Sequence, residues 1–117
     1  MVTCELSRVG TDDLIVVSGG TRPHIGAVVI ATYEETGVNI VSYGFPHHKE
    51  EDLFIELAKV WSNTFHQKTV MLGGIHIDNA TKEQIEELVN KTWDRFFHLM
   101  VDQKKKLNYI QNKSKCL

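Results

Sequence analysis

The segment IGAVVIATYEETGVNIVSY, residues 25–43, carries the clearest structural signal in the chain. Residues 28–30, Val-Val-Ile, are apolar and β-branched, which is typical of a strand in a sheet. Residues 38–43 alternate along the chain and predict a second strand. Glu-Glu-Thr-Gly at 34–37 separates them and predicts a hairpin turn with glycine near its end. The two strands are therefore expected to pair in antiparallel fashion.

The segments on either side of this hairpin extend the pattern. Residues 3–9 predict an edge strand, and residues 14–17, Leu-Ile-Val-Val, predict a buried strand. After the hairpin the period changes, because apolar side chains recur at steps of three and four residues, as on one face of an amphipathic helix. These side chains are Phe54, Leu57, Ala58, Trp61 and Phe65.

A fifth strand and a second helix complete the expected fold. Residues 69–77 predict a strand, and residues 81–84, Thr-Lys-Glu-Gln, form a capping box that starts a helix expected to end near Lys106. Four strands precede the first helix, so the order β-β-β-β-α-β-α favours a mostly antiparallel mixed sheet of about five strands, with both helices on one face. We predict a single two-layer α+β domain over residues 1–106 and a polar basic tail over 107–117.

Composition narrows the classes of function. With 117 residues, of which 42% are hydrophobic, the chain suits one globular domain, and its net charge of −2 argues against a nucleic-acid partner. The apolar runs are too short to span a bilayer, and the first residues do not resemble a signal peptide, so we predict a cytoplasmic protein without a membrane partner. Both faces of the central strands are apolar, which predicts a homo-oligomer that covers the second face.

Three short polar motifs place a histidine beside glycine or proline. They are Gly-Gly-Thr-Arg-Pro-His-Ile-Gly at 19–26, Phe-Pro-His-His-Lys-Glu at 45–50 and Gly-Gly-Ile-His-Ile-Asp-Asn at 73–79. Four of the six histidines lie in these motifs. Each motif lies at the end of an apolar run, where functional groups concentrate in folded proteins. We therefore predict that the three motifs form one polar site.

The first two motifs have features that suit an anion. Glycines such as Gly20 allow successive backbone N–H groups to point at a phosphate, and Arg22 supplies a planar cation that matches its geometry. The backbone N–H groups at the start of the first predicted helix suit a phosphate as well. A glycine-rich loop between strands, or a helix cap, is the structural alternative for each motif, and the sequence leaves both interpretations open.

The third motif allows two kinds of chemistry. In an extended chain, His76 and Asp78 project to the same side, as two metal ligands or as a histidine oriented by a carboxylate. A zinc site built from His24, His47 or His48, and His76 is arithmetically possible, but no His-Glu-x-x-His motif and no Cys-x-x-Cys pair supports it. We predict no metal, and the alternative function is a small metal-dependent hydrolase or lyase with a His/Asp cluster.

Taken together, GGTRPHIGAVVIA, PHHKE and GGIHIDNATKEQIEELV resemble the LpdD-like proteins, named for the small D subunit that accompanies UbiD-type gallate decarboxylases. The resemblance covers residues 18–90 with all three motifs in order. It implies a prenylated-flavin chaperone that binds prenylated FMN, or FMN, and hands it to a UbiD-like decarboxylase. Such a protein would not catalyse the decarboxylation itself.

The resemblance also implies which residues contact the cofactor. The family motif Pro-Gly-His-Lys-Glu matches residues 46–50, so His48 corresponds to the family histidine and His47 replaces the glycine. The implied contacts are Pro23, His24, Gly26, His48, Lys49, Glu50, His76, Asp78 and Asn79. Glycine amides and a cation suited to the flavin phosphate add Gly20, Arg22 and Gly74 to the predicted site.

Overall fold

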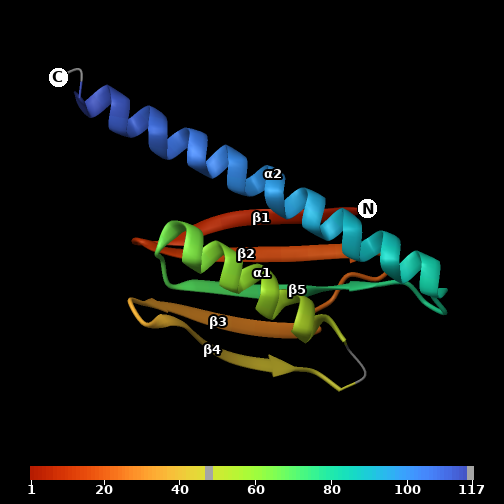
Figure 1. Ribbon diagram of the computed structural model, residues 1–117. Helices are drawn as coiled ribbons and strands as arrows, with labels where there is room; N and C mark the ends of the chain where they lie inside the picture. Colours follow the sequence, from red (N-terminus) through yellow and green to blue (C-terminus); the bar gives the residue numbers. More distant parts are fainter. Residues whose placement is uncertain (47–48, 116–117) are drawn as a thin grey trace.

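A computed structural model describes residues 1–46 and 49–115 and shows a five-stranded sheet with both helices on one of its faces (Figure 1). The element order is the predicted one, β-β-β-β-α-β-α, and the α+β class is confirmed. The elements are β1 (Val2–Val9), β2 (Asp12–Gly20), β3 (Ala27–Glu34), β4 (Gly37–Gly44), α1 (Glu50–Phe65), β5 (Thr69–His76) and α2 (Lys82–Lys115).

The last strand in the sequence lies at the centre of the sheet. The strand order is β1-β2-β5-β3-β4, with β5 parallel to β2 and antiparallel to β3. The predicted hairpin of residues 25–43 is present as the antiparallel pair β3 and β4. Strand β5 lies between this hairpin and the hairpin of β1 and β2. The last residues of β5 therefore pair with both β2 and β3: His76 lies opposite Gly20 of β2, and Gly73 lies opposite Ala27 of β3.

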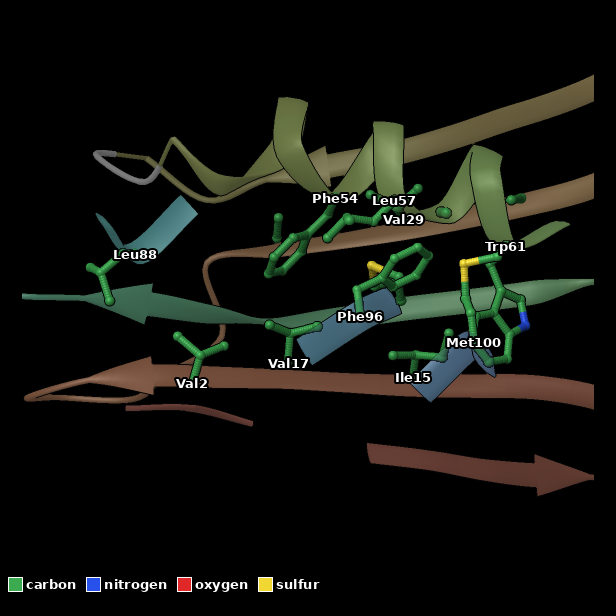
Figure 2. Packing of buried hydrophobic residues seen from close by; sticks show 14 residues of the cluster. Val2, Ile15, Val17, Val29, Phe54, Leu57, Trp61, Leu88, Phe96 and Met100 are labelled. Carbon is green, nitrogen blue, oxygen red and sulfur yellow. The ribbon is translucent and has the colours of Figure 1, made fainter. Parts of the chain in front are cut away.

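The core lies between the sheet and the two helices. Burial along β2 alternates with a period of two, as expected for a strand with one face on the core. Helix α1 packs on β3, β4 and β5, while α2 packs on β1 and β2. Figure 2 shows side chains from both layers meeting in one cluster. Its members are Val2, Ile15, Val17, Ala27, Val29, Ala31, Phe54, Leu57, Ala58, Trp61, Met71, Leu88, Phe96 and Met100.

One carboxylate is buried at the edge of this core. Asp13 is 2% exposed, and it accepts a hydrogen bond of 2.8 Å from the Trp61 indole Nε1. The Arg8 guanidinium lies 3.5 Å from its other oxygen. Burial of a charged group is costly unless it is paired, and Trp61 and Arg8 offset part of this cost, although Asp13 Oδ1 accepts no hydrogen bond within the described residues.

The opposite face of the sheet carries exposed apolar side chains, as the sequence predicts. Ile30 is 38% exposed, and Val41 and Tyr43 are 60% and 58% exposed. In the register of β3 and β4, Ile30 pairs with Val41 and Val28 pairs with Tyr43, so these residues form one continuous surface. We call Val28, Ile30, Val41 and Tyr43 the open-face patch.

Helix α2 is longer than the sequence predicts. It begins at Lys82 within the predicted capping box, in which the Gln84 N–H donates to Thr81 Oγ1 at 3.1 Å and the Thr81 N–H donates to Gln84 Oε1 at 2.8 Å. It continues to Lys115 instead of ending near Lys106, and its last turns project beyond the sheet (Figure 1). The segment 103–115 contains no glycine or proline to stop a helix and is rich in lysine, a good helix former. Over the described residues, neither helix is long and apolar enough to cross a membrane.

Candidate functional site

The first and third motifs meet where β2 and β5 end. The loop after β2 lies against the end of β5 and is held there by backbone hydrogen bonds. The Thr21 N–H donates to the His76 carbonyl at 2.8 Å, and the Gly26 N–H donates to the Gly73 carbonyl at 2.8 Å. The central position of β5 therefore brings together two segments that are about fifty residues apart in sequence.

Two glycines make this close approach possible. A Cβ atom at Gly20 would overlap the His76 carbonyl, and a Cβ atom at Gly74 would overlap the His24 carbonyl. Gly20 also has φ +85°, a left-handed value that favours glycine. The amides of Gly20 and Gly26 donate to the carbonyls of Met1 and Gly73, so they are not directed at an anion in this conformation. Contact of these glycines with a ligand stays a prediction.

Four side chains form a polar cluster at this end of the sheet: Arg22, His24, His76 and Asp78. Asp78 Oδ1 accepts a hydrogen bond from Arg22 Nη2 at 2.8 Å and lies 2.9 Å from His76 Nε2. The His24 and His76 rings have centroids 5.3 Å apart, and His24 Nδ1 lies 2.8 Å from the Arg22 carbonyl oxygen. The predicted placement of His76 and Asp78 on one side is confirmed, in the arrangement of a histidine oriented by a carboxylate.

The environment of Asp78 keeps its carboxylate charged. The hydrogen bond with His76, followed by the charge and hydrogen bond of Arg22, holds the pKa of Asp78 below its usual value. The Asp78 side chain is 52% exposed and that of Arg22 is 68% exposed, so solvent screens their attraction. The pair therefore orients the cluster more than it stabilises the fold.

A cavity of about 320 Å³ adjoins the polar cluster. It lies among the start of α1, the end of β5 and the start of α2, so the second and third motifs both contribute to it. Its polar lining consists of Lys49, Glu50 and His76. The rest of its wall is apolar, and we call it the apolar cavity. The apolar lining residues are Leu53, Ile75, Ile77, Ala80, Ile85, Leu88 and Val89.

The structure brings described residues of all three motifs close together. His76 belongs to both the polar cluster and the apolar cavity, and it thereby links Arg22, His24 and Asp78 to Lys49 and Glu50. The remaining predicted residues divide into two groups. Pro23 and Asn79 are exposed loop residues, and Asn79 has the left-handed φ of 53°. His47 and His48 lie outside the described residues.

Sequence analysis missed the apolar part of the site. Ile85, Leu88 and Val89 form part of the apolar stripe of α2, which indicates only a helix packed on a core. Ile85, however, is 52% exposed although it belongs to that stripe. The capping box places the first turn of α2 directly after the third motif. The short spacing between Asp78 and Thr81 is therefore the signal in the sequence that this turn lies beside the polar cluster.

The donor set of a metal site is incomplete over residues 1–46 and 49–115. Within these ranges no group of three or more His, Cys, Asp or Glu side chains is arranged to hold a metal ion. The alternative metal-dependent enzyme would use His47 or His48 as a further ligand, and neither is described. That alternative, like the predicted lack of a metal, stays a prediction.

Comparison with known proteins agrees with the motifs. A family model described as the prenylated flavin chaperone LpdD-like domain matches residues 1–104. The chain belongs to the LpdD-like family. Protein LpdD from Lactiplantibacillus plantarum is 36% identical over 92 residues, which cover 76% of this chain and 67% of that protein. The resemblance seen in the three motifs is thereby confirmed, and the matched region of this LpdD-like chain contains the polar cluster and the apolar cavity.

Proposed function

We propose that this LpdD-like protein is a non-catalytic chaperone that binds prenylated FMN and delivers it to a UbiD-like decarboxylase. The observation that carries the proposal is the position of His76, whose Nε2 lies 2.9 Å from Asp78 Oδ1 and which also lines the apolar cavity. A polar surface that carries the Arg22 guanidinium and an apolar cavity are therefore contiguous. Flavin nucleotides combine the same two kinds of group, since they have an anionic phosphate and a fused ring system with polar edges.

The residues present fit such a ligand. Arg22 and Lys49 supply cations for a phosphate, and the guanidinium of Arg22 matches phosphate geometry. The imidazoles of His24 and His76 offer hydrogen-bonding groups for the ring edge. The volume of about 320 Å³ lies at the low end of small-molecule sites, roughly 300–1,000 Å³, so the cavity suits part of the ligand while the rest lies over the polar cluster.

The exposure of the site supports a carrier. Much of the Arg22 and Asp78 side chains is open to solvent, so a ligand held there stays accessible to a second protein. The bound cofactor supplies the decarboxylation chemistry only after transfer to the enzyme. The role of the LpdD-like chain is to orient the nucleotide through Arg22, whose position is held by Asp78, and to shield apolar parts of the ligand from water.

We also propose that two copies of the chain associate through the open-face patch. The patch is apolar, and the neighbouring residues of the same sheet face, Thr32 and Asn39, are uncharged. A two-fold axis would place the same patch on both partners, so no charge is buried in the contact. Association of this kind removes from water the apolar area that a single chain leaves exposed.

Equilibrium titration tests the chaperone proposal. Purified protein is titrated with prenylated FMN and with FMN, with flavin fluorescence and thermal melting as the two readouts. His76→Ala and His24→Ala are expected to weaken binding about twofold to tenfold, the loss expected when a hydrogen bond to the ring edge is removed. His98→Ala is the matched control, since His98 lies on the exposed surface of α2 and, among the described residues, its ring contacts Asp94 of the same helix.

Two outcomes would contradict the proposal. The first is that neither flavin changes the fluorescence or the melting temperature at concentrations up to the millimolar range. The second is that loaded protein fails to activate a cofactor-free UbiD-like decarboxylase that free prenylated FMN does activate. Binding followed by transfer supports the chaperone role in both of its parts.

A further inference from the structure

The apolar cavity differs chemically from the polar cluster beside it. Its wall is hydrocarbon apart from Lys49, Glu50 and His76. Glu50 is 8% exposed, so the cavity has a carboxylate built into its wall. A phosphate placed inside would face that carboxylate and would lose water without gaining enough donors. The cavity therefore suits an uncharged hydrocarbon group, whereas the phosphate of a nucleotide belongs over Arg22.

We propose that the apolar cavity is the selectivity element of the site and receives the isoprenoid-derived part of the prenylated flavin. This inference rests on the proposed function and deepens it, because it assigns one part of the ligand to one set of residues. Plain FMN lacks this isoprenoid-derived group and would fill the cavity less completely. The chain should then bind the prenylated flavin more tightly than FMN, although both carry the same phosphate.

The wall of the cavity is held in place before any ligand binds. On one side, Leu53 belongs to α1, whose Phe54 and Leu57 are fully buried in the core. On the other side, the capping box of Thr81 and Gln84 fixes the first turn of α2, and Leu88 of that helix is 8% exposed within the same core (Figure 2). A preformed wall loses little conformational freedom on binding, which favours affinity.

Ile85 is the residue that most directly reports on this assignment. It lines the cavity and yet is 52% exposed, so its side chain forms part of the rim. A hydrocarbon group that enters the cavity would cover Ile85 and remove its apolar surface from water. Each buried methylene tightens binding about fourfold, so burial of two or three such groups gives a preference of roughly fifteenfold to sixtyfold.

The test compares two ligands on three variants. Dissociation constants for prenylated FMN and FMN are measured on the wild type, on Ile85→Ala and on Ala80→Phe. Wild-type protein is expected to prefer the prenylated flavin at least tenfold. Ile85→Ala should reduce that preference about threefold or more, because it removes apolar area from the cavity wall. Ala80→Phe should abolish the preference, because the larger side chain at this half-buried lining position fills the cavity. Affinity for FMN should change less than about twofold in both variants.

Ile110→Ala is the matched control, because Ile110 is a 59% exposed isoleucine of the same helix that does not line the cavity. Thermal melting of each variant establishes that it is folded. Equal affinity of the wild type for the two flavins overturns this inference but leaves the chaperone proposal standing, whereas binding of neither flavin overturns the chaperone proposal itself. A preference that survives both cavity variants unchanged overturns the assignment to the cavity.

Discussion

His76 Nε2 and Arg22 Nη2 both contact Oδ1 of Asp78, at 2.9 Å and 2.8 Å, so a single carboxylate oxygen joins the end of β5 to the loop after β2. His76 and Asp78 are two residues apart, and their proximity follows from the extended chain. Arg22 is more than fifty residues away, and only the pairing of β2 with β5 brings it to the same oxygen. The shared contact therefore couples the orientation of a cation to that of an imidazole.

Asp78→Asn tests the pH dependence of this contact. The folded-state pKa of Asp78 is lowered, so its contribution to stability is present above the unfolded-state pKa and is lost as the pH falls through the folded-state pKa. The wild type and Asp78→Asn should therefore differ in melting temperature at neutral pH and converge as the solution becomes strongly acidic. Melting curves of both proteins from neutral pH down to about pH 2 measure this. A difference that stays constant over the whole range would contradict the assigned cause.

Arg22→Ala should weaken the binding of flavins that carry a phosphate. A charge-assisted hydrogen bond to phosphate is worth about tenfold in affinity at a partly exposed site, so a loss of that size is expected for FMN. A flavin without the phosphate should bind Arg22→Ala and the wild type equally well. Arg95→Ala, at an exposed arginine of α2, is the control. Equal losses for the two ligands would show that Arg22 does not contact the phosphate.

Gly20→Ala should destabilise the fold through the contact with β5. The added Cβ overlaps the His76 carbonyl, and φ is +85°, so the loop has to move away from the strand. We expect a loss of about 2–4 kcal/mol, the sum of overpacking and left-handed strain. Gly10→Ala separates the two effects, because Gly10 has φ +62° and nothing within 4 Å of its Cβ position, so only about 1–2 kcal/mol is expected.

Urea unfolding of both glycine variants gives these free energies directly. If Gly20→Ala costs no more than Gly10→Ala, the close approach of the loop to β5 does not exist in solution. If the larger cost appears, flavin binding by the folded fraction should fall as well, since the loop carries Arg22 and His24.

Val41→Lys should separate the proposed dimer. The substitution places a charge at the centre of the open-face patch, where Val41 is 60% exposed and pairs with Ile30. Sedimentation velocity should show a dimer for the wild type and a monomer for the variant. The melting temperature of the monomeric variant should differ little from that of the wild type. Gln111→Lys, at an exposed position near the end of α2, should remain dimeric. A monomeric wild type would refute the proposed association.

A chain ending at Lys106 should retain the fold, in line with the proposed domain of residues 1–106. Gln103, 7% exposed, is the last buried residue described in α2, and residues 104–113 are exposed or nearly so. The described side chains that are removed, 107–113, are exposed and contribute nothing to the core, so the melting temperature should fall by no more than a few degrees. Near-ultraviolet circular dichroism of the shortened chain should match that of the full chain. Loss of this signal would show that the end of α2 is needed for packing.

Local patterns in the sequence predicted the elements that depend on near neighbours. The hairpin of residues 25–43, the apolar stripe of α1 and the capping box of Thr81 all rest on spacings of two to four residues, and all are present. The predicted end of α2 near Lys106 is too early, because the described side chains of its last turns, 104–113, are exposed and form no core-facing stripe that would mark a continuing helix. Such turns depend on helix propensity alone, which is a weak signal.

The order of strands and helices, the apolar stripes that face the core and the three motifs that carry the family resemblance can all be recognised in the amino-acid sequence. Which motifs touch depends on the folded arrangement, because the insertion of β5 between two hairpins is a pairing of distant segments that no local pattern encodes. The tertiary structure also decided that Gly20 and Gly74 serve close backbone approach, and that the start of α2 completes an apolar cavity beside His76. Packing between elements sets these relationships, and packing depends on the whole fold.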